Sequence, residues 1–125
     1  MSTVDVNELI LYINRHAKDV LSDVAGLTYT DFEIDYKTQR AVYMSLHQIG
    51  ELAGRLPLLF RQKHTQMKWA GMRQVRNMIA HEYIKLNLEI IWDAIKNNIP
   101  DLIKYSDALL TQFSQNHEPS IYKKD

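Results

Sequence analysis

Cysteine is absent from this 125-residue sequence, which excludes disulfide bonds, thiolate nucleophiles and cysteine-ligated zinc sites. The 4 glycines are scattered along the chain, so no glycine-rich phosphate-binding loop is present. No apolar run approaches the roughly 18 residues that a membrane span requires. The first residues lack the basic region followed by an apolar one that marks a secretion signal. We therefore expect a cytoplasmic protein with no membrane anchor.

Acidic residues are also missing from one long stretch, although the formal net charge of the whole chain is zero. We call the stretch between Glu51 and Glu82 the acid-free segment. Its basic side chains are Arg55, Arg61, Lys63, Lys68, Arg73 and Arg76, together with His64 and His81. Two interpretations are open at this point. The segment either contributes ordinary solvated helix faces or forms one positive surface suited to phosphates.

Apolar residues recur every three to four positions over long segments, and this spacing is typical of amphipathic helices. We expect helices from about Asp5 to Val24, from Asp31–Asp35 to Leu56, from about Gln66 onwards after a polar link at Arg61–Gln66, from a cap at Asn87, and from Pro100. No long strand alternation or repeat is present. The pattern predicts one all-α domain over residues 1–115, an up-and-down bundle of four to five helices, followed by a flexible tail at 116–125.

The stretch "RNMIAHEY" contains the side chains best suited to catalysis or to phosphate binding. Arg76 can bind a phosphate through two parallel hydrogen bonds. Histidine titrates near neutral pH, so His81 can both accept and donate a proton. Asn77 can orient either group, and Tyr83 supplies a hydroxyl. On an α-helix, five residues advance the chain by about 500°, so Arg76 and His81 are about 140° apart and share no face of a straight helix.

These groups suit cleavage of RNA by its own 2′-hydroxyl, a reaction that needs a base, an acid and a positive charge near the phosphorus. The reaction needs neither a metal ion nor an organic cofactor. Either one histidine serves twice, or two chains each contribute one at a two-fold axis. The same four residue types also occur on amphipathic helix ends without any catalytic role. The remaining histidines are isolated, and we expect them to be structural or exposed and to form no metal site: His16, His47, His64 and His117.

The sequence resembles the HEPN superfamily and, within it, the HepT-like group, also called DUF86. Arg76, His81 and Tyr83 match the group's Arg-x4-His-x-Tyr motif, and Trp69 stands seven residues before Arg76, as it does in the group. The resemblance continues upstream in "DFEIDYKTQRAVYMSLHQIGELAGRL" and downstream in "LEIIWDAIKNNIPDL". It covers the chain from about Asn7 to Leu110.

Two departures from the group's pattern occur near the motif. Lys68 stands where a proline often precedes the tryptophan. The group's "GMRN" would place its arginine at Arg76, whereas "GMR" occurs here at Gly71–Arg73. We align the motif on Arg76 followed by Asn77, because seven residues between Arg73 and His81 would exceed the usual range.

The resemblance implies a homodimeric HEPN bundle that acts as a metal-independent endoribonuclease toxin on RNA. Arg76 and His81 carry over as catalytic residues and Asn77 as a supporting one. Glu51 and Arg73 are candidates for further contacts to the site, although Glu51 fits a structural ion pair equally well. The implied partner is an MNT-type nucleotidyltransferase antitoxin, which would neutralise the toxin by AMPylation of Tyr83.

Two other functions remain open at the level of the sequence. The chain could be a non-catalytic subunit of a two-component nucleotidyltransferase that binds nucleotide or substrate, with Arg76 holding a phosphate. It could also be a purely structural helical dimer. The sequence does not indicate which RNA would be cut.

Overall fold

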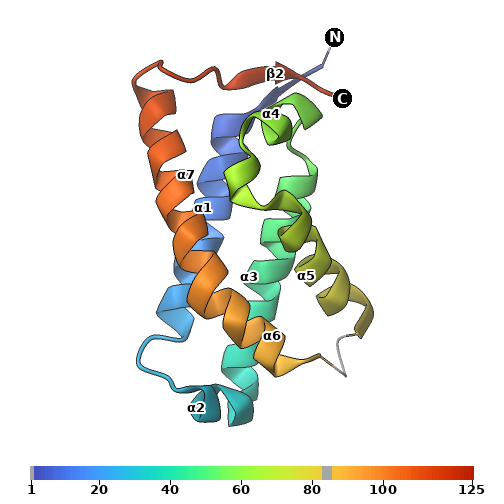
Figure 1. Ribbon diagram of the computed structural model, residues 1–125, viewed down its shortest axis with the longest axis vertical. Coiled ribbons are helices and arrows are strands. Elements are labelled where there is room, and N and C mark those ends of the chain that lie inside the picture. Colours follow the sequence, from blue (N-terminus) through green and yellow to red (C-terminus); the bar gives the residue numbers. More distant parts are fainter. Residues whose placement is uncertain (1, 83–85) are drawn as a thin grey trace.

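The computed structural model of the protein describes residues 2–82 and 86–125. Long helices run side by side in an up-and-down bundle, with short helices at both ends (Figure 1). In chain order the elements are β1 (Thr3–Asp5), α1 (Val6–Asp23), α2 (Tyr29–Ile34), α3 (Tyr36–Gly54), α4 (Leu58–Lys63), η1 (Thr65–Met67), α5 (Trp69–Glu82), α6 (Leu88–Asp93), η3 (Ala94–Asn98), α7 (Ile99–Ser114) and β2 (Ile121–Lys123). The predicted all-α bundle is confirmed. No helix in the described part of the chain is long and apolar enough to cross a membrane.

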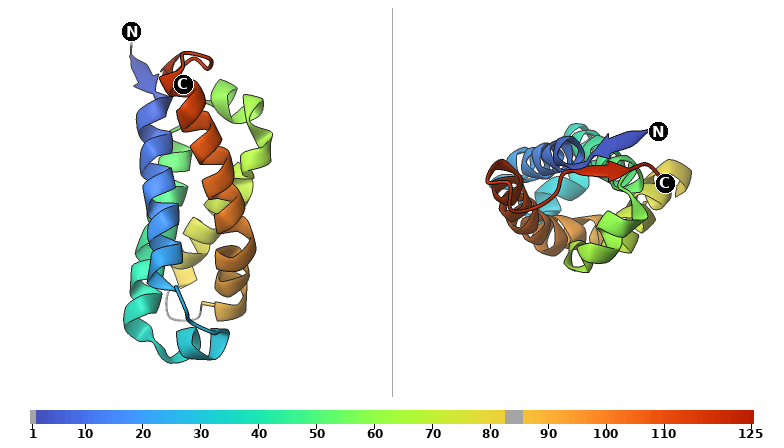
Figure 2. Two further views of the ribbon diagram at one scale, coloured as in Figure 1. Left: turned by 90° about the vertical axis from the view of Figure 1, so that its left-hand side faces the viewer. Right: turned by 90° about the horizontal axis from the view of Figure 1, so that it is seen from above.

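The core lies between α1, α3 and α7. The apolar stripe of α1 is largely buried: Leu9 and Leu21 are partly exposed, and the fully buried members are Val6, Ile10, Ile13, Ala17 and Val20. These positions are three or four residues apart and therefore share one face of the helix. The buried face of α3 meets this stripe from the other side, and Figure 2 shows the helices enclosing the centre of the bundle.

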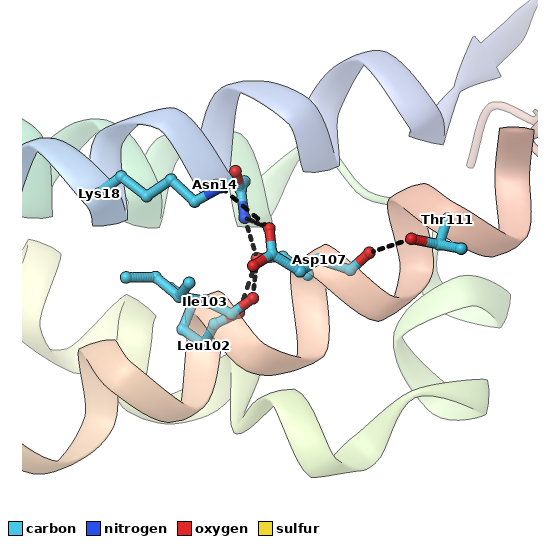
Figure 3. Close-up of polar contacts among 7 residues, drawn as sticks. Asn14, Lys18, Leu102, Ile103, Asp107 and Thr111 are labelled. Atoms are coloured by element: carbon cyan, nitrogen blue, oxygen red, sulfur yellow. Dashed lines mark hydrogen bonds and ion pairs between the residues drawn. The ribbon is translucent and has the colours of Figure 1, made fainter.

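A buried polar network joins α1 to α7 (Figure 3). The side-chain amide of Asn14 donates to Ser106 Oγ at 2.8 Å and to Asp107 Oδ1 at 2.9 Å. Ser106 Oγ in turn donates to the backbone carbonyl of Leu102 at 2.7 Å. The hydrogen bond from Lys18 and then that from Asn14 hold the pKa of Asp107 below its usual range. Because buried polar groups are costly unless paired, this network fixes α7 against α1 in one register.

The start of α3 agrees with the prediction, and the connector before it is more ordered than expected. Asp35 caps α3 by accepting from the backbone N–H of Thr38 at 3.0 Å. The preceding connector contains α2, which begins with a reciprocal capping box between Thr28 and Asp31. Such a box satisfies two backbone donors of a short helix locally. The α3 helix ends at Gly54, two residues before the predicted Leu56.

The predicted polar link at Arg61–Gln66 is wrong. The link region instead completes α4 and continues into η1, and the following helix, α5, begins only at Trp69. His64 lies between α4 and η1, is buried, and packs against the ring of Phe60 at 4.5 Å between centroids. The sequence pattern did not predict this helix because Phe60 is the single residue of α4 that is buried, so no apolar periodicity is visible.

The two helices expected after Asn87 form one continuous helical run. Asn87 caps α6 as predicted, accepting from the backbone N–H of Glu89 at 3.0 Å. The run then passes through the π-helical η3 into α7, where Pro100 is the second residue, so the predicted start of this helix is confirmed although no break precedes it. Proline cannot donate the backbone hydrogen bond of a regular helix, and a local π turn before it accommodates this loss.

Residues 116–125, which we expected to form a flexible tail and which we call the C-terminal strap, include a short strand. Strand β2 pairs antiparallel with β1, with Val4 opposite Tyr122. Figure 2 shows the two strands side by side across one end of the bundle. Tyr122 packs edge-to-face on the buried Phe60, with 5.6 Å between ring centroids. The strand that pairs with the strap lies at the opposite end of the sequence. Local sequence patterns therefore could not predict this pairing.

Carboxylates of the strap bind both ends of α4. Asp125 accepts from the backbone N–H of Leu58 at 3.0 Å. Glu118, whose side chain is 9% exposed, accepts from His64 Nε2 at 2.7 Å and pairs with Lys63 Nζ at 3.2 Å. Burial raises the pKa of Glu118, but the hydrogen bonds from His64 and Lys63 outweigh this effect and hold the pKa below its usual range.

We predict that Glu118→Gln lowers the free energy of unfolding by about 1–2 kcal/mol at pH 7. A carboxylate with a lowered pKa in the folded state stabilises the fold above its unfolded pKa, and this stabilisation is lost as the pH falls through the folded pKa. The difference between wild type and variant should therefore shrink below about pH 4.5. Urea unfolding at several pH values measures it. Asp19→Asn, at an exposed site, is the control and should change stability by a few tenths of a kcal/mol. A gap that stays constant down to pH 3 would contradict the assignment.

Candidate functional site

Helix α5 carries three of the residues predicted to be catalytic or supporting, and its main neighbour is α3 (Figure 1). Ile79 of α5 is buried. At the start of α5, Trp69 Nε1 donates to the carbonyl of Arg61 at 3.2 Å, which ties this end of the helix to α4. The position of α5 is therefore set by α4 at its first residue and by α3 along its length.

The contact between α3 and α5 is closest at Gly50. A Cβ atom added there would lie 2.3 Å from Arg76 Cβ and 3.0 Å from the backbone oxygen of Met72. Separations this short are not tolerated between real atoms, so only glycine permits the observed approach. One turn further along α3, a Cβ atom at Gly54 would lie 3.8 Å from Arg73 Nη2. The two glycines therefore form a floor beneath the two arginines.

Two neighbours orient the guanidinium group of Arg76. Its Nε donates to Glu51 Oε1, and its Nη1 donates to Asn77 Oδ1 at 2.6 Å. The side chains of Arg76 and Glu51 are 34% and 33% exposed, and an ion pair this exposed contributes little stability. Within the described residues, Nη2 of Arg76 makes no hydrogen bond. The ion pair thus orients the arginine and leaves one edge of it able to bind a ligand.

These residues surround a cleft of about 420 Å³, which we call the arginine cleft. Its lining residues are Gly50, Glu51, Gly54, Arg55, Arg73, Arg76 and Asn77. Three arginines face one carboxylate, so the cleft carries an excess of positive charge. Among the residues that the structure describes, neither Arg55 nor Arg73 has an ion-pair or hydrogen-bond partner through its side chain. A concave site with several arginines favours a phosphate group.

The structure brings together most of the candidate residues and separates one. Arg76, Asn77, Glu51 and Arg73 all line the arginine cleft. His81 is exposed in the last turn of α5 and is absent from the described lining of this cleft. Because α5 continues through His81, it stays about 140° around the helix from Arg76 and about 7.5 Å further along the axis. Tyr83, the predicted modification site, lies outside the described residues.

Arg55 is the lining residue that the motif did not indicate. It follows the last residue of α3 and is exposed. Two sequence signals point to it: Arg55 is a basic residue of the acid-free segment, and its position four residues after Glu51 places it one helical turn further on. Which residues line the cleft depends on how α3 packs against α5. The spacing of residues within either helix does not predict this packing.

Part of the positive charge of the acid-free segment is compensated away from the arginine cleft. Lys63 and His64 are bound to Glu118 of the strap. Arg61 Nε donates to the carbonyl of Leu56 at 3.1 Å. Only the remaining arginines of the segment gather at one place, which is the arginine cleft. The tertiary structure thus concentrates the positive charge of the segment in a smaller site than the sequence indicated.

A second cavity, of about 220 Å³, opens between α5 and the helical run η3–α7. Apolar side chains dominate its lining, including Ile49, Val75 and Leu102. None of the predicted site residues is among its described lining residues. Over residues 2–82 and 86–125, no cluster of three His, Asp or Glu side chains could hold a metal ion.

Comparison with known proteins identifies relatives along most of the chain. The family model described as "Ribonuclease HepT-like" matches residues 13–109. "Putative RNase MJ0127" of Methanocaldococcus jannaschii is 36% identical over 121 residues, covering 97% of this chain and 100% of the relative. "Putative RNase TTE0752" of Caldanaerobacter subterraneus is 34% identical over 99 residues, or 79% and 88% of the two chains. "Probable ribonuclease HepT" of Thermococcus cleftensis is 31% identical over 101 residues, or 72% and 92%. No solved structure matches significantly.

We predict opposite effects for two glycine substitutions. Gly50→Ala should lower the free energy of unfolding by about 1–2 kcal/mol, because overpacking against Arg76 outweighs the gain in helix propensity. Gly71→Ala is the control: its added Cβ meets nothing within 4 Å, so the substitution should stabilise α5 by about 0.5–1 kcal/mol. Urea denaturation measures both. If the two variants gain stability equally, α3 and α5 do not approach as described.

Proposed function

Because the chain belongs to the ribonuclease HepT-like family, we propose that it is an endoribonuclease that cleaves RNA without a metal ion, using Arg76 and His81. The observation that carries the proposal is the orientation of Arg76 by Glu51 and Asn77 at the edge of an open, positively charged cleft. A phosphodiester in this cleft would meet a guanidinium already held in position. Such preorganised positive charge is a major source of catalysis in phosphoryl chemistry.

The reaction assigns a role to each group. The 2′-hydroxyl of a ribose attacks the adjacent phosphorus while a base removes its proton, and an acid protonates the departing 5′-oxygen. The products are a 2′,3′-cyclic phosphate and a 5′-hydroxyl. Arg76 stabilises the negative charge that develops on the phosphorane oxygens. His81 acts as base or acid, because an imidazole can exchange a proton near neutral pH. Asn77 holds Arg76 in place.

The separation of His81 from the arginine cleft supports a site shared between two chains. Within one protomer, His81 points from a different side of α5 than Arg76. In a two-fold symmetric dimer the same surface meets itself, so His81 of the partner subunit can approach Arg76. We therefore propose a homodimer with a composite site at its interface.

We further propose an MNT-type nucleotidyltransferase antitoxin as the partner, on the basis of the family resemblance. The modified residue would be Tyr83, two positions after His81. An attached AMP brings a negative phosphate and a bulky base next to the catalytic histidine. Both effects oppose the binding of RNA, so the modification would switch off a toxin.

We predict that purified wild-type protein cleaves single-stranded RNA in the presence of EDTA. His81→Ala should abolish cleavage, and Arg76→Ala should slow it by roughly 10²–10³, the effect of removing one charge-stabilising group. Initial rates on a labelled oligonucleotide measure the losses. His117→Ala and Arg40→Ala replace exposed residues far from the cleft in the sequence and serve as matched controls.

Mixed dimers test the shared site. When Arg76→Ala and His81→Ala chains are exchanged into one dimer, the interface holds an intact arginine from one chain and an intact histidine from the other. Activity should therefore return in part. No recovery in dimers that have demonstrably exchanged would contradict the shared site. Tight binding of ATP by wild type without cleavage of any RNA would instead favour the nucleotide-binding subunit.

The modification has its own test. Incubation of the protein with ATP, Mg²⁺ and its nucleotidyltransferase partner should add the mass of an adenylate to the intact chain and abolish RNA cleavage. The Tyr83→Phe variant should gain no mass and remain active, because it lacks the acceptor oxygen. Intact-protein mass spectrometry reads both outcomes. An adenylate on another residue would refute the role of Tyr83.

A further inference from the structure

We propose that Arg73 and Arg55 form a second phosphate subsite in the arginine cleft, which binds the RNA backbone one phosphate away from the bond that is cut. This inference rests on the proposed ribonuclease function and extends it. Both arginines line the same cleft as Arg76 and are exposed. Neither lies in the Arg-x4-His motif, so the catalytic assignment gives them no role.

The backbone geometry places the two subsites one after the other along the cleft. Arg73 and Arg76 are three residues apart on α5, so they lie on the same face, about 4.5 Å apart along the axis. Beneath them, Gly50 and Gly54 are one turn apart on α3, and each glycine lies under one of the arginines. At Gly50 the missing side chain lets Arg76 pack directly against α3, and at Gly54 it leaves room beside the guanidinium of Arg73.

The two subsites differ in electrostatic compensation. Arg76 is paired with Glu51, so part of its charge is already neutralised. Arg73 and Arg55 have no acidic partner within the described residues. Uncompensated arginines gain most from a phosphate, because binding one releases counterions from the nucleic acid. The Arg73–Arg55 subsite therefore supplies affinity, whereas Arg76 is held in position for the reaction.

The arrangement favours a polynucleotide over a mononucleotide. One arginine subsite would suffice to hold the single phosphate of a nucleoside monophosphate. Two subsites in sequence, one compensated and one not, fit a chain with phosphates at regular intervals. We find no aromatic side chain among the described residues of the cleft lining. Recognition here is therefore by backbone charge, and it should be insensitive to base sequence.

The test measures binding separately from cleavage. In the His81→Ala background, the affinity for a labelled oligouridylate of about a dozen nucleotides is measured at several salt concentrations. Arg73→Gln should weaken binding roughly threefold to tenfold at low salt and reduce the slope of log K against log salt by about 0.7. Arg55→Gln should act in the same direction. Arg73→Lys should retain the slope, because it keeps the charge.

Arg40→Gln is the matched control, since Arg40 is an exposed arginine of α3 that does not line the cleft. It should leave both affinity and slope unchanged. In the active protein, Arg73→Gln should raise KM more than it lowers kcat. A slope for Arg73→Gln equal to that of Arg40→Gln would overturn the subsite.

The outcome also separates this inference from the ribonuclease proposal. If wild type binds the oligonucleotide with the expected slopes but cuts no RNA, the ribonuclease proposal fails and the subsite stands. If ATP or inorganic phosphate binds and depends on Arg73 while the oligonucleotide does not bind, the polynucleotide assignment is overturned.

Discussion

The close approach of α3 and α5 at Gly50 is the constraint on which the candidate site depends. A side chain at this position would separate the helices, because Arg76 Cβ occupies the space that the first carbon would need. Without this approach, Glu51 on α3 could not reach the guanidinium of Arg76 on α5. The glycine thus acts through packing, and its effect is to bring two charged groups from distant parts of the chain into one cleft.

Within that cleft, charge compensation divides the arginines into two kinds. Arg76 is held by a carboxylate and an amide, which fix its orientation at the cost of part of its charge. Arg55 and Arg73 have no acidic partner among the described residues, so their charge is not compensated. A site that must both attract a polyanion and position one phosphate benefits from this division, because the same arginine cannot be strongly compensated and strongly attractive at once.

The C-terminal strap fixes the other end of this arrangement. Its carboxylates bind α4 at Leu58 and at Lys63–His64. Trp69, the first residue of α5, donates a hydrogen bond to α4. Helix α5 is therefore anchored where it begins and packed along α3, while the end that carries His81 is exposed. This places the histidine where a second chain can meet it, as the proposed composite site requires.

Local patterns in the sequence by themselves determined the helical class, the start of α3 near Asp35 and the cap at Asn87, because helix periodicity and capping depend on neighbours within four residues. The motif also indicated the family and the residues Arg76 and His81. Only the tertiary structure decided that Arg55 joins Arg73 in the cleft, that α5 continues through His81 and so keeps it apart from Arg76, and that the strap pairs with β1. These outcomes depend on which distant segments pack together and on how closely they approach. The spacing of residues within a single helix does not determine either.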